Sequence, residues 1–224
     1  MKKLAIIADK ILNTVYDWHF DFRYSVSTRK FVDIANLETN SESILGARRY
    51  EGIPVRHFKN FLNSLDFDYK KFHFIDLGSG KGRAIMLASF YPFKSVTGVE
   101  IASNLHQVAI HNIENLQNSK KNICKKISSI NSDVLDYIVP EGDKIFFLYN
   151  PFDSKILKIF LDKLENQIKP DQKIFFIYFN PLRGYLLELV GYNLVKVSNH
   201  SNHNRIAHLY QLSSKKTYAI LASC

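Results

Sequence analysis

From residue 72 onward, short apolar runs alternate with segments whose apolar residues recur every three or four positions. Apolar runs of five to seven residues are typical of strands, and spacings of three and four are typical of helices. The pattern predicts strands over Phe72–Leu77, Ser95–Glu100, Ile127–Ser132, Lys144–Tyr149 and Lys173–Phe179, and helices over Lys81–Phe90, Ser103–Gln117, Ser154–Ile168 and Pro181–Val190. Such alternation indicates βαβ units that form a parallel sheet.

Two further β-patterned runs, Asn193–Ser198 and Arg205–Leu212, flank the polar segment Asn199–Asn204. We interpret them as an antiparallel hairpin that completes a seven-strand sheet. The expected fold is therefore α/β, a three-layer Rossmann-like arrangement that is mostly parallel.

The N-terminal third differs in character. It has helical patterns over Lys3–Trp18 and Val55–Leu65, with an irregular polar segment, Asp21–Ser43, between them. We expect residues 1–70 to form a helical cap or lid, because they are too few and too polar to fold alone. Residues 71–224 are the expected core domain.

Composition narrows the class of protein. The 224 residues are 46% hydrophobic and 23% charged, as in an ordinary globular domain. No apolar run approaches the roughly 20 residues of a membrane-spanning helix, so we expect no membrane partner. Only two cysteines occur, which favours a reducing, cytoplasmic location. The net charge of +9 comes from scattered short groups, so a solvated surface is favoured over a nucleic-acid site.

The strongest chemical signal lies where the first core strand ends. Asp76-Leu-Gly-Ser-Gly-Lys-Gly82 turns from that strand into a helix, and its glycines allow a ligand close to the backbone. The spacing excludes a P-loop, and Arg83 replaces the third glycine of a dinucleotide-binding turn. A cationic nucleoside cofactor, S-adenosylmethionine, suits a loop that places the carboxylate of Asp76 beside the ligand.

Other candidate residues follow the next strands. Glu100 ends the second strand at the spacing typical of a ribose-binding acid, although a solvated strand end is an alternative. Ile101 follows it as a further expected cofactor contact. Asp133, after the third strand, either accepts a hydrogen bond from adenine or caps the next turn. Asn150, after the fourth strand, either faces the acceptor or belongs to an ordinary Asn-Pro turn.

With these residues the chain resembles the class I, seven-strand S-adenosylmethionine-dependent methyltransferases over roughly residues 45–212. The resemblance implies cofactor contacts from Asp76, Gly78, Ser79, Gly80, Gly82, Glu100, Ile101, Asp133, Asn150 and Tyr50. Asn150-Pro-Phe152 is similar to the acceptor motif of amino-group methyltransferases but lacks its second proline, which disfavours base or glutamine N-methylation. The chain is also similar to bacterial methyltransferases that share Tyr50-Glu51, and more faintly to non-SET protein-lysine methyltransferases.

The expected activity is methyl transfer to an amine or hydroxyl of a protein or small molecule, with Asn150, Glu51 and Asp153 as catalytic candidates. Two alternatives stay open, a nucleic-acid methyltransferase and a protein that uses the cofactor for aminopropyl transfer or sensing. No metal site is expected, and His200 and His203 are interpreted as parts of a surface turn. The acceptor and the oligomeric state are left open by the sequence.

Overall fold

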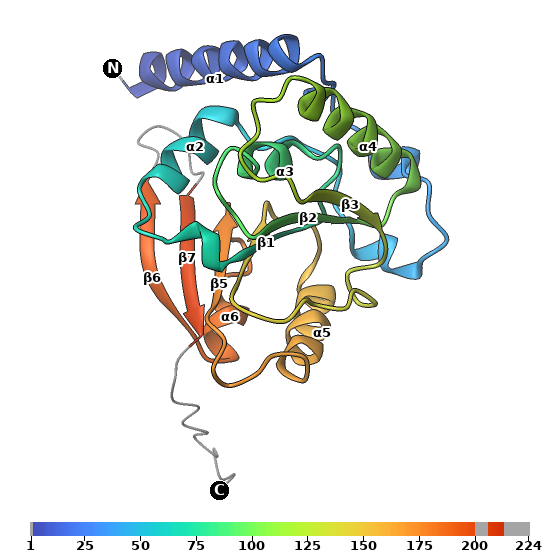
Figure 1. Cartoon of the computed structure of the whole chain (residues 1–224), viewed down its shortest axis with the longest axis vertical. Helices are drawn as coiled ribbons and strands as arrows, with labels where there is room; N and C mark the ends of the chain where they lie inside the picture. The colour runs from blue at the N-terminus through green and yellow to red at the C-terminus, as the bar shows by residue number, and fades with distance from the viewer. Residues whose placement is uncertain (1, 200–205, 213–224) are drawn as a thin grey trace, which may run out of the picture.

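The computed structural model describes residues 2–199 and 206–212, so the predicted turn with His200 and His203 lies outside the described residues. A seven-stranded sheet with the order β3-β2-β1-β4-β5-β7-β6 forms its centre (Figure 1). The strands are β1 His73–Leu77, β2 Ser95–Glu100, β3 Ile127–Asn131, β4 Lys144–Leu148, β5 Ile174–Phe179, β6 Tyr192–Asn199 and β7 Ile206–Leu212. Strands β1 to β5 pair in parallel, and β7 pairs antiparallel with β5 and β6. The predicted fold class and terminal hairpin are confirmed.

Helices cover both faces of the sheet, because successive strand residues point to opposite sides. Phe74 and Phe147 pack on one face with α2 and α3, whereas Ile75 and Phe146 pack on the other with α5. The helices are α1 Lys2–Tyr24, α2 Val55–Asn63, α3 Arg83–Ala88, α4 Ser103–Asn118, α5 Ser154–Glu165 and α6 Tyr185–Leu189. Short 3₁₀ helices are η1 Ile34–Asn36, η2 Glu42–Gly46 and η3 Tyr69–Lys71. The result is a three-layer α/β domain.

The N-terminal third is more ordered than its sequence suggested. Helix α1 continues through Asp21 to Tyr24, where the sequence predicted an irregular segment, and η1 and η2 follow in the loop. Helix α2 buries Phe58 and Phe61 in the same hydrophobic cluster as the sheet residue Phe74. Residues 55–63 therefore share the core, and the division of the chain near residue 70 stays a prediction.

Candidate functional site

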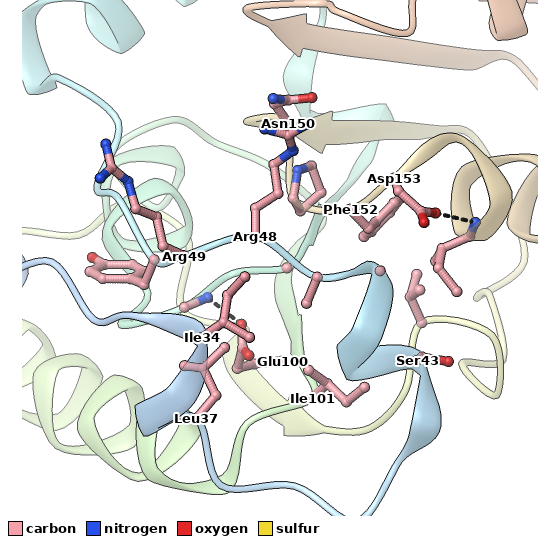
Figure 2. Close-up of a pocket in the computed structure, with 18 of the residues that line it drawn as sticks. Ile34, Leu37, Ser43, Arg48, Arg49, Glu100, Ile101, Asn150, Phe152 and Asp153 are labelled. Atoms are coloured by element: carbon pink, nitrogen blue, oxygen red, sulfur yellow. Dashed lines mark hydrogen bonds between the residues drawn. The ribbon is translucent and has the colours of Figure 1, made fainter.

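A cavity of about 830 Å³ opens at the carboxyl ends of the parallel strands, within the ~300–1,000 Å³ typical of small-molecule sites. In open α/β sheets this edge is where ligands bind. Loops of the N-terminal third form one wall, and the residues that follow β1, β2 and β4 form another (Figure 2). The predicted residues that line the cavity are Tyr50, Glu51, Gly78, Gly80, Glu100, Ile101, Asp133, Asn150 and Asp153.

The glycine loop after β1 brings its backbone close to two neighbours. Gly78 and Gly80 have φ angles of 77° and 54°, in the left-handed region that favours glycine. A Cβ atom at Gly78 would lie 2.5 Å from Cβ of Pro151, and one at Gly80 would overlap the ring of Tyr50. Neither glycine therefore has room for a side chain, and the bare backbone at these two positions borders the cavity.

Glu100 braces this loop from the end of β2. Its Oε2 accepts a 2.6 Å hydrogen bond from the Gly80 N–H, and its Oε1 accepts one of 2.9 Å from the Ala102 N–H. Burial raises the pKa of Glu100, although backbone hydrogen bonds, including these two, oppose the increase. The carboxylate is 5% exposed, so it is not the solvated strand end that the sequence left open.

Three other predicted loop residues do not line this main cavity. Asp76 and Ser79 border a small neighbouring cavity of about 20 Å³, and Gly82 lines neither of the two. Burial and then the charge of Glu100 raise the pKa of Asp76 well above its usual range. The hydroxyl of Ser79 is buried without a hydrogen-bond partner among the described residues. Gly82 instead allows close packing of α3, since a Cβ there would lie 3.2 Å from that of Ala109.

Tyr50 forms part of the wall opposite Glu100. Its hydroxyl donates a 2.8 Å hydrogen bond to the carbonyl of Thr28, and its amide donates one of 2.9 Å to the carbonyl of Val32. Burial raises the pKa of its phenol, which stays protonated at neutral pH. The side chain is fixed between the N-terminal segment and Gly80, so residues 28–50 are anchored over the cavity.

Asp133 makes contacts that fit both of its sequence interpretations. It lines the cavity, and its Oδ1 accepts a 2.9 Å hydrogen bond from the Leu135 N–H as a turn cap does. Its Oδ2 accepts a 2.7 Å hydrogen bond from the Ser41 hydroxyl. Burial raises its pKa, but the hydrogen bonds outweigh burial and place the pKa below its usual range. Asp133 therefore presents an ionised carboxylate that holds η2 against the sheet.

At the other end of the cavity, Asn150 adopts a left-handed conformation with φ of 52°. Its Oδ1 accepts hydrogen bonds from the Tyr178 hydroxyl at 3.2 Å and from Nη1 of Arg183 at 2.8 Å. Arg48 also extends toward Asn150 (Figure 2). The side-chain oxygen that the sequence suggested for the acceptor is thus engaged by an arginine and a tyrosine.

The two carboxylate candidates near Asn150 differ in their contacts. Asp153 caps α5, because its Oδ1 accepts a 3.0 Å hydrogen bond from the Ile156 N–H (Figure 2). Glu51 lies close to Tyr149, whose hydroxyl donates to Oε1 over 3.4 Å. Asp153 thus serves as the cap of α5, whereas Glu51 contacts a tyrosine at the cavity wall.

Sequence reasoning missed the arginines and several N-terminal residues of the cavity. Arg48 and Arg49 line it beside Tyr50, and Asp33, Ile34 and Leu37 line it from η1 and the residues beside it. The pair Arg48-Arg49 directly before Tyr50-Glu51 was the available signal. Across the described ranges 2–199 and 206–212, no group of three His, Cys, Asp or Glu residues is placed to hold a metal ion.

Comparisons with known proteins agree with this geometry. Residues 46–175 match the family described as "Histone methylation protein DOT1". A search of curated proteins finds no match to the sequence.

Solved structures share the fold at low sequence identity. An S-adenosylmethionine-dependent methyltransferase from Aquifex aeolicus has a TM-score of 0.53 and 15% identity, covering 70% of this chain and 89% of its own. An RNA methyltransferase from Salinibacter ruber, in complex with S-adenosylhomocysteine, has a TM-score of 0.51 and 16% identity, covering 73% of this chain and 94% of its own. A predicted N6-adenine-specific DNA methylase from Listeria monocytogenes has a TM-score of 0.52 and 10% identity, covering 72% of this chain and 51% of its own.

Proposed function

Because the chain belongs to the DOT1 histone methylation family, and is therefore an S-adenosylmethionine-dependent methyltransferase, we propose that it methylates an amine on a protein or a small molecule. The amine of a protein lysine is one such acceptor. The observation that carries the proposal is that neighbouring residues of one segment contact both charges: Tyr149 contacts Glu51, and Asn150 contacts Arg183.

The residues around the cavity suit the cofactor. Gly78 and Gly80 line the cavity, and we assign them to the amino-acid part of the cofactor, whose ammonium suits the nearby carboxyl group of Asp76. We assign Glu100 and Ile101 to the ribose and Asp133 to the adenine, because they line the cavity after β2 and β3. The buried Ser79 hydroxyl, which has no hydrogen-bond partner among the described residues, and the bare backbone of Gly78 and Gly80 at the cavity both fit a ligand held against the loop.

The bound cofactor supplies an electrophilic methyl group on its sulfonium. The protein's task is then to align an acceptor, and such positioning can contribute several kcal/mol to lowering a barrier. Tyr149 and Phe152 border the Asn150 end of the cavity and provide walls for a flat or apolar acceptor group. We assign Asn150 a positioning role, because Arg183 and Tyr178 fix the orientation of its amide.

An acceptor amine must be neutral to react, whereas a lysine has an unperturbed pKa near 10.4. Nearby positive charge disfavours protonation, and Arg48 and Arg183 both lie close to Asn150. In this proposal Glu51 takes the proton released there, and the hydrogen bond that it accepts from Tyr149 orients its carboxylate. The arginines would thus lower the pKa of the bound amine, and Glu51 would accept its proton.

Nucleic-acid methylation is the second candidate. It is supported by Arg48 and Arg49 at the cavity wall, which form no salt bridge within the part of the chain described here, and by the net charge of +9. Phosphate contacts of this kind make binding fall steeply as salt rises. Tight binding of RNA or DNA with such a salt dependence, followed by methyl transfer to it, would favour this candidate over the amine.

The cofactor sites are tested by calorimetric titration with S-adenosylmethionine, S-adenosylhomocysteine and, as a control, NADH. We expect binding of the first two only.

The acceptor is tested by following labelled methyl transfer to lysine peptides, small amines and RNA. Glu51→Gln should lower turnover on amines at neutral pH by at least tenfold and shift the pH profile alkaline, while the exposed control Glu114→Gln should have no effect. Unchanged turnover in Glu51→Gln would remove Glu51 from the mechanism.

A further inference from the structure

Helix α1 exposes its apolar side and turns its acidic side inward. Six large apolar residues recur at spacings of three or four and form one stripe, and each is between 49% and 73% exposed: Leu4, Ile7, Ile11, Val15, Trp18 and Phe22. A surface helix normally buries such a stripe. Figure 1 shows α1 (blue) along the outside of the domain, beyond α2.

The polar side of α1 faces the protein. Asp9 forms a salt bridge with Arg56 of α2, and Asp17 forms one of 2.8 Å with the buried Arg83. Asp21 accepts hydrogen bonds from the backbone and hydroxyl of Thr28. These three are all the acidic residues of the helix, so their contacts, together with the buried ring of Phe20, fix its rotation and leave the apolar stripe outside.

The charges left at the surface of α1 are basic. Lys10 and Arg23 are exposed, and every carboxylate of the helix is paired on the inner side. Two copies of this face would bring like charges together, which disfavours a symmetric helix pair. An anionic surface would instead attract this basic face, and the protein's net charge of +9 would strengthen the attraction.

A shallow cavity adjoins the C-terminal end of the stripe. Its volume is about 280 Å³, and it combines Trp18 and Phe22 with the basic residues Arg29 and Lys30 and with Asp21, whose Oδ2 lies 3.5 Å from Nε of Arg29. The two rings stack at 5.2 Å between centroids. Tryptophan beside basic groups is typical of the boundary between lipid headgroups and acyl chains, where one end of the site is apolar and the other polar.

We propose that α1 binds an anionic lipid surface, lying in the interface with its stripe in the acyl region and Lys10, Arg23, Arg29 and Lys30 near the headgroups. The helix does not need to cross the bilayer, and no helix among the described residues is long and apolar enough to do so. The sequence-based expectation of no membrane partner considered only spanning segments. The proposal is independent of the acceptor of the methyl group.

Trp18 is the only tryptophan of the chain, so its fluorescence reports on the stripe directly. The full chain is titrated with vesicles of phosphatidylcholine alone and with vesicles containing phosphatidylglycerol, and binding is measured by emission shift and by co-sedimentation. We expect a blue shift and co-sedimentation with the anionic vesicles only. Ile11→Glu should weaken this binding at least tenfold, and Lys10→Glu should weaken it several-fold.

The matched control is Ile138→Glu, which adds the same charge at an exposed apolar residue outside α1. Because Ile11 and Ile138 are both exposed, both variants should keep the wild-type melting temperature, and only Ile11→Glu should lose binding. Equal binding to neutral and anionic vesicles, or no binding to either, would overturn the proposal. So would a concentration-dependent dimer, detected by sedimentation equilibrium, that shifts Trp18 emission without vesicles.

Discussion

Replacing Glu100 by glutamine tests the centre of the proposed cofactor site. Both carboxylate oxygens of Glu100 accept hydrogen bonds from buried backbone amides, those of Gly80 and Ala102. Glutamine has a single carbonyl oxygen, so its amide nitrogen must face one of these N–H donors. The substitution keeps the size of the side chain while it removes one acceptor and the negative charge.

The structure sets the expected magnitudes. A buried N–H without a partner costs about 1–3 kcal/mol, which in a domain of this length lowers the melting temperature by about 2–12 °C. A ribose hydroxyl that loses a charged acceptor loses a similar free energy, so cofactor affinity should fall about ten- to a hundredfold. The two losses arise from different contacts of the same carboxylate.

Calorimetric titration with S-adenosylhomocysteine and thermal unfolding of the same samples separate these effects. Glu114→Gln, on the exposed side of α4, makes the same chemical change without either contact and should match the wild type. A lowered melting temperature with unchanged affinity would show that Glu100 only braces the glycine loop. A wild-type melting temperature together with a wild-type affinity in Glu100→Gln would refute the reasoning.

Three further predictions concern buried charges. Because burial raises the pKa of Asp76, binding of a cationic cofactor should release a proton, and the affinity should increase as pH rises toward that pKa. Calorimetry in buffers of different ionisation enthalpy should detect the released proton, and Asp76→Asn should abolish the release. Arg83→Met leaves Asp17 without its ion pair and should lower the free energy of unfolding by about 3–5 kcal/mol in urea titrations, whereas adding Asp17→Asn should restore part of the loss. Burial lowers the pKa of Lys144 to about 8, so between that pH and about 10.5 the unfolded chain holds a proton that the folded protein lacks. The free energy of unfolding should rise over this interval in wild type, and Lys144→Met should remove the rise; a wild-type slope in the variant would exclude Lys144 as its source.

The fold followed from the sequence because its signals are local. Buried parallel strands favour apolar runs such as Ile174–Phe179, and the predicted strands Phe72–Leu77 and Lys173–Phe179 each lie within a residue of the observed β1 and β5. The predicted stripe of α5, from Ile156 to Leu164, is buried as expected. The sequence also indicated that the glycine loop and Glu100 share one edge of the sheet, because a tight turn at a strand end and its spacing to the next strand end are properties of adjacent segments.

Only the tertiary structure decided which residues from distant segments meet. Arg183 contacts Asn150 from the loop before α6, and Ser41 contacts Asp133 across 92 positions of sequence. No periodicity records such pairs, since they depend on how loops fold over the sheet edge. The same holds for α1, because its apolar stripe is visible in the sequence, but the sequence cannot show that Asp9 pairs with Arg56 and Asp17 with the buried Arg83. Those ion pairs set the rotation of the helix, and the rotation decides that its apolar side faces outward.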